Sequence, residues 1–432
     1  MLISLCLSCA ARAETFKIEE FFLENGLQVV VIENHKAPII QQMLFYKVGA
    51  ADEKIGQGGI AHLLEHLMFR GTQKVKGQAF NRILEENGAE SNAFTSQDVT
   101  AYHELADVSR LELAMFLEAD RMQGLKISDA DFLTERDIVY QERKQRVDNN
   151  PPAKFFEAVR KTLWQNHPYS RPVTGQDSEI MSLSKEDALG FYRKHYAPNN
   201  AVLILSGDID VATAKKLAQK YYGGLKASEK EQTKFEKMPE VYRARIEMEL
   251  PDVRLGRLIR IWAAPSFNYK PEQVYALDVL NEYLGGDENS PLYQKLVIRD
   301  KAALSVSTSY DAVTRSYGSF VLSAVPAGEN NAAFEKAVER AWTYALNQLT
   351  EEKLSLTKQK MLADLVYLTD SPVSLAQTAG YMAATGAGLE HLRNYGAHIE
   401  AVTLEQVKQA AAELWQKAPQ ATGVLYPEGS KQ

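Results

Sequence analysis

Two histidines and a glutamate lie close together in the segment His62-Leu-Leu-Glu65-His66. Residues four apart on a helix project from one face about one turn apart, so both imidazoles can reach one Zn²⁺ ion. Glu65 is three residues from His62, and its carboxylate can accept a proton from a water beside the metal. His-x-x-Glu-His is a signature of zinc hydrolases, and it predicts such a site here. The alternative is an amphipathic helix that carries two histidines by chance.

A hydrolytic zinc site takes three protein ligands as a rule and leaves one position for water. The segment Asp131–Arg146 offers two carboxylates, Glu135 and Glu142, which are seven residues apart and therefore two turns along one helical face. The spacing makes both of them candidates to face the histidines. The alternative is an ordinary helix surface, because Lys and Arg surround both residues.

The hydrophobic pattern predicts an α+β fold with a largely antiparallel sheet, because long helical segments alternate with strands at hairpin spacing. In the first half of the chain, strands are expected at 27–32, 39–48, 90–94, 99–105 and 201–205, and helices at 59–69, 79–87, 110–125, 129–147 and 211–222. The second half repeats this order, with strands near 244–249 and 258–263, helices from 272, a hairpin over 303–325 and further helices to 415. A duplicated domain is therefore expected, with the zinc motif in the first copy only.

The length of 432 residues favours more than one hydrophobic core. A charged segment that is poor in core residues, 226–240, is typical of a solvated linker. We therefore predict a zinc-binding domain over 14–225, this linker, and a second domain without zinc over 241–432.

At this point the sequence resembles a known family of zinc metallopeptidases, that of insulysin, pitrilysin and the mitochondrial processing peptidase, over nearly everything after residue 13. It is most similar to bacterial, zinc-bearing members of single-repeat length. The resemblance implies two homologous domains, each a mostly antiparallel sheet packed against helices, and one zinc ion per chain. It further implies that Glu142 is the third ligand and that Glu135 orients a ligand through a hydrogen bond.

The same resemblance implies how a peptide binds. Ser91-Asn-Ala-Phe-Thr95 resembles the family's active-site edge strand, so Asn92 and Ala93 are expected to contact the substrate, and strand pairing grips a peptide without demanding one sequence. The alternative is an Asn turn before a Thr-rich strand. Arg299 matches a substrate-binding arginine of the second half, but Val306 stands where relatives carry a tyrosine.

The missing tyrosine implies a partner: a paralogous subunit that carries the Arg and Tyr, or a second copy of this chain. Within this chain, Tyr310, Arg315 and Tyr317 are alternative sources of the missing contact. The expected activity is a zinc-dependent endopeptidase that acts on peptides or unfolded polypeptides, with Glu65 as general base. The alternative is a non-catalytic scaffold or assembly subunit, which the intact motif argues against.

The composition and the first residues of the sequence indicate which partners and which cell compartment to expect. A net charge of -7 argues against a nucleic-acid surface. Residues 1–13 are apolar and end in Ala11-Arg-Ala13, which is typical of a signal-peptidase site, so we expect Glu14 to be the mature N-terminus of a periplasmic protein from a Gram-negative bacterium. No basic residue precedes the apolar run, so the start is expected to lie further upstream; the alternative is a ragged cytosolic N-terminus. Both cysteines fall in this leader, and no later stretch is long and apolar enough for a membrane span.

Overall fold

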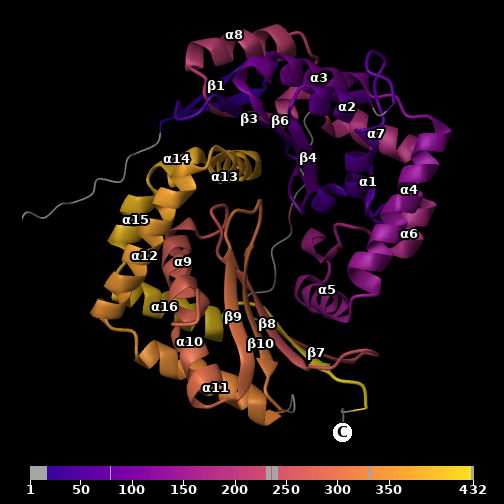
Figure 1. Ribbon diagram of the computed structural model, residues 1–432. Helices are drawn as coiled ribbons and strands as arrows, with labels where there is room; N and C mark the ends of the chain where they lie inside the picture. Colours follow the sequence, from indigo (N-terminus) through magenta and orange to yellow (C-terminus); the bar gives the residue numbers. More distant parts are fainter. Residues whose placement is uncertain (1–16, 78, 230–234, 236–241, 329–331, 430–432) are drawn as a thin grey trace, which may run out of the picture.

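The structure is a computed structural model in which residues 17–77, 79–229, 235, 242–328 and 332–429 are described (Figure 1). The expected leader 1–13 and most of the expected linker 226–240 lie outside these residues, so the predicted domain boundaries stay a prediction. Below, the first half denotes residues 17–229 and the second half residues 242–429.

The first half forms a six-stranded sheet with the strand order β1-β2-β6-β3-β5-β4. Its strands are β1 Ile18–Phe22, β2 Gln28–Glu33, β3 Ile39–Tyr46, β4 Glu90–Thr95, β5 Thr100–Asp107 and β6 Ala201–Gly207. Its helices are the 3₁₀ turn η1 Ala50–Asp52, α1 Ile60–Leu67, α2 Ala79–Glu86, α3 Leu111–Gly124, α4 Asp129–Arg143, the π-helical turn η3 Lys144–Asp148, α5 Pro151–Trp164, α6 Asp177–Ser182, α7 Lys185–His195 and α8 Val211–Tyr222.

The second half forms a five-stranded sheet with the order β7-β11-β8-β10-β9. Its strands are β7 Arg243–Glu249, β8 Arg257–Ala264, β9 Ala303–Asp311, β10 Gly318–Pro326 and β11 Gln420–Tyr426. Its helices are α9 Val274–Gly285, α10 Pro291–Tyr293, the π-helical turn η7 Gln294–Arg299, α11 Ala332–Asn347, α12 Glu351–Asp370, α13 Pro372–Thr385, α14 Leu389–Arg393, α15 Tyr395–Ala401 and α16 Leu404–Gln416.

The two sheets repeat one topology, as the sequence predicted. Apart from β1, each strand of the first sheet has a counterpart in the second: β2, β6, β3, β5 and β4 correspond to β7, β11, β8, β10 and β9. In both sheets the first of these pairs is parallel and the others are antiparallel. The α+β class and the two-domain architecture are therefore confirmed. The strand β1 and the helices α5, α6 and α7 lie outside the predicted ranges.

One helix of each half packs on the sheet of the other half. Helix α5 lies on β7, β8 and β11, while α13 lies on β3 and β6, as Figure 1 shows. These contacts are tight: an added Cβ at Gly380 of α13 would lie 2.0 Å from a ring atom of Phe45, and one at Gly423 of β11 would lie 2.2 Å from a methyl of Val159. Because the apolar outer face of each sheet is covered by the other half, the two halves share their cores.

Candidate zinc site

Helix α1 carries the His-x-x-Glu-His segment and is almost entirely buried. The helix begins after Gly59, whose φ of +87° suits glycine. A Cβ added at Gly59 would lie 3.0 Å from the carbonyl oxygen of Thr174 and 3.1 Å from Gly175 Cα. The Glu53 carboxylate accepts hydrogen bonds from the amides of Gly59 and Ala61, at 3.0 and 3.1 Å. These bonds satisfy two of the amides that a helix start leaves unpaired. Glu53 thus fixes where α1 begins, a role that the sequence did not reveal.

Helix α4 lies beside α1 and supplies the two glutamates. Its start is fixed by a capping box between Ser128 and Asp131. The predicted helix 129–147 is α-helical only to Arg143 and continues as the π-helical turn η3, which begins two residues after Glu142. Such turns occur often at functional sites. The sequence periodicity gave no signal for it.

Three of the predicted residues come together. One ligand atom each of His62, His66 and Glu142 lies within 4.8 Å of the others. The distance from Glu142 Oε2 is 3.6 Å to His62 Nε2 and 3.9 Å to His66 Nε2. Ligand atoms about 2.0–2.1 Å from a tetrahedral zinc ion are separated by roughly 3.4 Å, so this donor set is close to the required spacing.

The chemistry of the donor set also fits zinc. Glu142 Oε2 is a buried atom that makes no hydrogen bond within the described residues, and Arg146, which is largely exposed, lies 3.2 Å from it. Burial lowers the pKa of His62 to about 3, with smaller contributions from His66 and Arg146. A neutral imidazole is the form that binds a metal, so burial favours that form.

Glu135 is in hydrogen-bond contact with His66. Its Oε2 lies 2.9 Å from His66 Nδ1, and its other oxygen accepts from Arg70 Nε. Burial would raise the pKa of Glu135, but the hydrogen bonds from His66 and Arg70 outweigh burial and hold it below its ordinary value. An ionised carboxylate at His66 Nδ1 favours the tautomer with its proton on that nitrogen, which leaves Nε2 free for a metal. The role of Arg70 was not predicted, because Arg70 lies beyond the end of α1 at Leu67 and outside the predicted helix 59–69.

Glu65 lies on α1, and its side chain contacts the end of the edge strand β4. Thr95 Oγ1, at the end of β4, donates a hydrogen bond to Glu65 Oε2. Burial raises the pKa of Glu65, whereas the bond from Thr95 lowers it; the net shift is upward. A raised carboxyl pKa suits a group that takes and returns a proton near neutral pH. Thr95 belongs to the predicted edge-strand segment, but no role for its hydroxyl was predicted.

The strand predicted to bind the substrate, β4, lies at the edge of the six-stranded sheet. β4 pairs only with β5 among the described strands, which leaves its other side open. Asn92 and Ala93 lie on β4; Asn92 is exposed and Ala93 is partly buried. Asn92 Oδ1 accepts from the amide of Ala93 at 2.8 Å.

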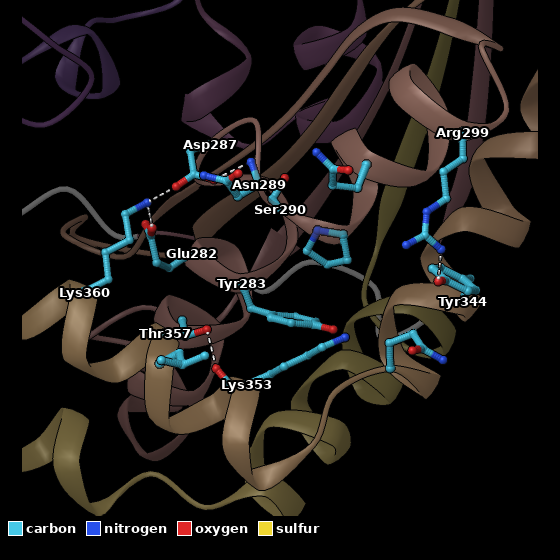
Figure 2. Close-up of a pocket in the computed structure, with 14 residues that line it drawn as sticks. Glu282, Tyr283, Asp287, Asn289, Ser290, Arg299, Tyr344, Lys353, Thr357 and Lys360 are labelled. Carbon is cyan, nitrogen blue, oxygen red and sulfur yellow. Dashed lines mark hydrogen bonds and ion pairs between the residues drawn. The ribbon is translucent and has the colours of Figure 1, made fainter.

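Arg299 lies apart from these residues. It lines a cavity of about 370 Å³ formed wholly by the second half, and its Nη1 donates to Tyr344 Oη at 2.7 Å (Figure 2). In the same cavity, Lys360 of α12 pairs with Glu282 of α9 at 2.6 Å. In element order α9 and α12 are the counterparts of α1 and α4, so a direct ion pair joins these two helices in the half without the zinc motif. The described part of this chain does not bring Arg299 to the zinc motif.

The other tyrosine and arginine candidates of the second half are engaged elsewhere. Tyr310 Oη donates to the carbonyl of Pro265 at 2.7 Å, and Arg315 forms ion pairs with Asp52 and Asp98. Tyr317 is buried in the core that α5 shares with the second sheet.

Comparisons with known proteins agree with this fold and show the family of the chain. Residues 28–177 match the family model described as insulinase (peptidase family M16), and residues 182–361 match the model described as the peptidase M16 inactive domain. The chain is 30% identical over 381 residues to zinc protease PqqE of Helicobacter pylori, which covers 87% of this chain and 85% of that protein. The chain therefore belongs to peptidase family M16.

Two solved structures show the same fold. A crystal structure of a protease from Helicobacter pylori matches with a TM-score of 0.90 and 27% identity, over 95% of this chain and all of that one. The periplasmic protease PqqL from Escherichia coli matches with a TM-score of 0.78 and 18% identity, over 95% of this chain and 47% of PqqL. Within the described residues, no helix has the length and apolar character needed to cross a membrane.

Proposed function

We propose that this chain is a zinc-dependent endopeptidase in which His62, His66 and Glu142 bind one zinc ion. The observation that carries the proposal is the convergence of two imidazole nitrogens and one carboxylate oxygen within 4.8 Å, beside Glu65 and the open edge of β4. Membership of the M16 family, which includes a relative named as a zinc protease, supports the same reading at family level.

Each residue has a defined task in this proposal. Glu65 takes a proton from the attacking water and returns it to the leaving amine, as a general base and then a general acid. Zinc supplies Lewis-acid chemistry, which makes water more acidic and a peptide carbonyl more electrophilic. β4 binds the peptide as an added strand near Asn92 and Ala93, so main-chain hydrogen bonds place the scissile bond beside Glu65.

The experiment that tests this proposal separates the base from the ligand. Glu65→Gln should keep one zinc per chain and lose nearly all peptide hydrolysis, because the amide cannot accept the proton. Glu142→Gln should lose zinc as well, because a ligand is removed. Zinc content after dialysis is measured by atomic emission, and activity with a quenched fluorescent peptide. Equal zinc content in wild type and Glu142→Gln would remove Glu142 from the ligand set.

A non-catalytic role is the competing proposal, and one match bears on it. The model described as an inactive domain covers residues 182–361. That range contains none of His62, Glu65, His66 and Glu142, so the match concerns the half without the zinc motif. A wild-type protein that binds zinc but cleaves no peptide, alone or with a partner, would favour the non-catalytic role.

We further propose that efficient cleavage needs a second subunit, either a paralogue with the Arg and Tyr or another copy of this chain. Val306 faces the core of the second half and offers no hydrogen-bond donor, and Tyr310 and Arg315 have the partners described above. A missing oxyanion donor costs on the order of 10²–10³ in rate. Equal rates for the chain alone and for the chain mixed with its paralogue would contradict this proposal.

The location and the domain limits also stay proposals. We propose export to the periplasm after cleavage behind Ala13, on the basis of the apolar residues 1–13. The domain limits 14–225 and 241–432 rest on the charged segment between them and on the repeated topology.

A further inference from the structure

Arg315 connects the second half to the first. It lies in the turn between β9 and β10, and its Nη1 and Nη2 donate to the two oxygens of Asp52 at 3.0 and 2.7 Å. Its Nε and its backbone amide donate to the two oxygens of Asp98, each at 3.0 Å. The side chain of Arg315 is 15% exposed, and those of Asp52 and Asp98 are 4% and 6% exposed. One arginine therefore joins two buried carboxylates of the other half.

The two carboxylates belong to the segments that lead into the candidate zinc site. Asp52 ends η1 and precedes Glu53, whose carboxylate caps the start of α1. Asp98 lies in the turn between β4 and β5, three residues after Thr95, the partner of Glu65. Asp52 is thus adjacent to Glu53, and Asp98 is three residues from Thr95, and both of these neighbours contact helix α1.

The η1 segment and the β4–β5 turn also touch each other. The amides of Ala50 and Ala51 donate to the carbonyls of Ser96 and Gln97, at 3.0 and 2.9 Å. These two bonds set the spacing of the segments. The planar guanidinium of Arg315 adds a charged link with directional bonds to both.

Neighbouring groups complete the hydrogen bonding of this link. Tyr169 Oη donates to Asp98 Oδ2 at 2.6 Å and accepts from the amide of Ser316 at 3.1 Å. The ring of Phe235 lies 5.3 Å from the guanidinium carbon of Arg315. A buried ion pair with several satisfying hydrogen bonds specifies geometry, whereas removing one member leaves an uncompensated charge.

We propose that Arg315 is a positioning residue for the candidate zinc site, acting through Asp52 and Asp98 to fix the edge strand β4 against helix α1. The inference rests on the proposed peptidase function, because it concerns how a peptide on β4 meets Glu65. A displacement of about 1 Å between reacting groups can lower a rate about 100-fold. The zinc ligands come from α1 and α4, which Arg315 does not contact, so its loss should affect turnover more than zinc content.

The test is Arg315→Lys in the full chain, zinc-loaded and assayed with any partner that the wild type requires. Lysine keeps the positive charge, but it cannot make the forked contact to Asp52 and the bond to Asp98 together. We expect kcat to fall 10- to 100-fold, by more than KM rises, with one zinc ion still bound. Hydrogen–deuterium exchange should accelerate in residues 93–100 and 58–62. This measurement reports on the link of Arg315 to Asp52 and Asp98 without any activity assay.

The matched control is Arg260→Lys. Arg260 is also largely buried, with 6% of its side chain exposed, and it donates to two glutamates, Glu335 and Glu339, at 2.9 and 3.1 Å, but all three lie in the second half. Its substitution should lower the unfolding midpoint and leave kcat and exchange near α1 unchanged. A merely structural role of Arg315 would give the same pattern as this control.

A second variant guards against failure to fold. Arg315→Met combined with Asp52→Asn and Asp98→Asn removes the link without leaving unpaired buried charges, and it should show the same loss of kcat and faster exchange. Wild-type kcat and exchange in both folded variants would overturn the role of Arg315. A wild type that binds zinc but cleaves nothing would instead refute the proposed function, while the exchange measurement still decides whether Arg315 fixes β4.

Discussion

Replacing Glu135 by glutamine should weaken zinc binding, although Glu135 is not one of the three proposed ligands. The carboxylate serves His66 with one oxygen and Arg70 with the other. A glutamine amide has one acceptor oxygen and one NH₂ group, so it can satisfy only one of these two donors. If the amide oxygen faces Arg70, the NH₂ group faces His66 Nδ1 and donates to it. This favours the His66 tautomer that carries its proton on Nε2, which is the nitrogen nearest Glu142.

The size of the effect follows from this hydrogen bond. Losing a group that orients a metal-binding histidine typically costs about 10- to 100-fold in metal affinity. That range corresponds to about 1.4–2.7 kcal/mol of binding free energy. Glu135 is only 5% exposed, so water has little access to His66 Nδ1 and cannot easily replace the lost hydrogen bond. The effect should therefore lie within this range.

The measurement is zinc affinity by competition with a chromophoric chelator. Glu335→Gln is the matched control, because the Glu335 carboxylate also serves two donors, one with each oxygen, but these are Arg245 and Arg260 of the second half. The control should bind zinc as the wild type does. If Glu135→Gln keeps its affinity within about twofold of wild type, below the expected minimum of tenfold, the orienting role of Glu135 is wrong.

Three further predictions concern stability and processing. Burial raises the pKa of Glu53 to about 8 from 4.5, so the folded protein holds the carboxyl proton more tightly than the unfolded chain does. The stability of wild type relative to Glu53→Gln should therefore fall as the pH rises from 4.5 to 8. A difference in urea-unfolding free energy between the two proteins that stays constant across this range would contradict the prediction. Gly380→Ala should destabilise the protein by about 1–3 kcal/mol, because the added Cβ meets the Phe45 ring. Gly190→Ala is the control and should not destabilise it, because an added Cβ there has nothing within 4 Å. Equal urea-unfolding midpoints for wild type and Gly380→Ala would show that α13 does not pack this tightly. Mass spectrometry of the exported protein should find Glu14 as the first residue, and intact Met1 in a cytosolic fraction would exclude processing.

Local spacing was enough to predict the zinc motif and most elements around it. His62 and His66 are one helical turn apart, and Glu135 and Glu142 are two turns apart, so a helical period alone places each pair on one face. Glu142 as third ligand came from family resemblance, because the spacing itself did not separate it from Glu135. The doubled topology was also visible, since the order of strands and helices recurs along the chain.

Contacts between distant segments were not predictable in the same way. Periodicity shows that α5 has an apolar face with Phe155 and Val159, but it does not show that the sheet of the other half covers that face. Arg315 is 217 residues from Asp98 and 263 from Asp52, and no local pattern links them. Glu53 and Thr95 were missed for a related reason, because their roles depend on how loops and strand ends meet α1.

The exchange of helices between the halves has a consequence for the order of folding. The outer face of the first sheet, including Val30, Met43 and Phe45, is covered by α13, which ends at Thr385. A chain growing from its N-terminus therefore cannot bury this face until nearly nine-tenths of its 432 residues have been made. Until then the exposed apolar strands are open to aggregation or to a chaperone. The half that carries the zinc motif thus cannot complete its packing before a helix of the other half has been made.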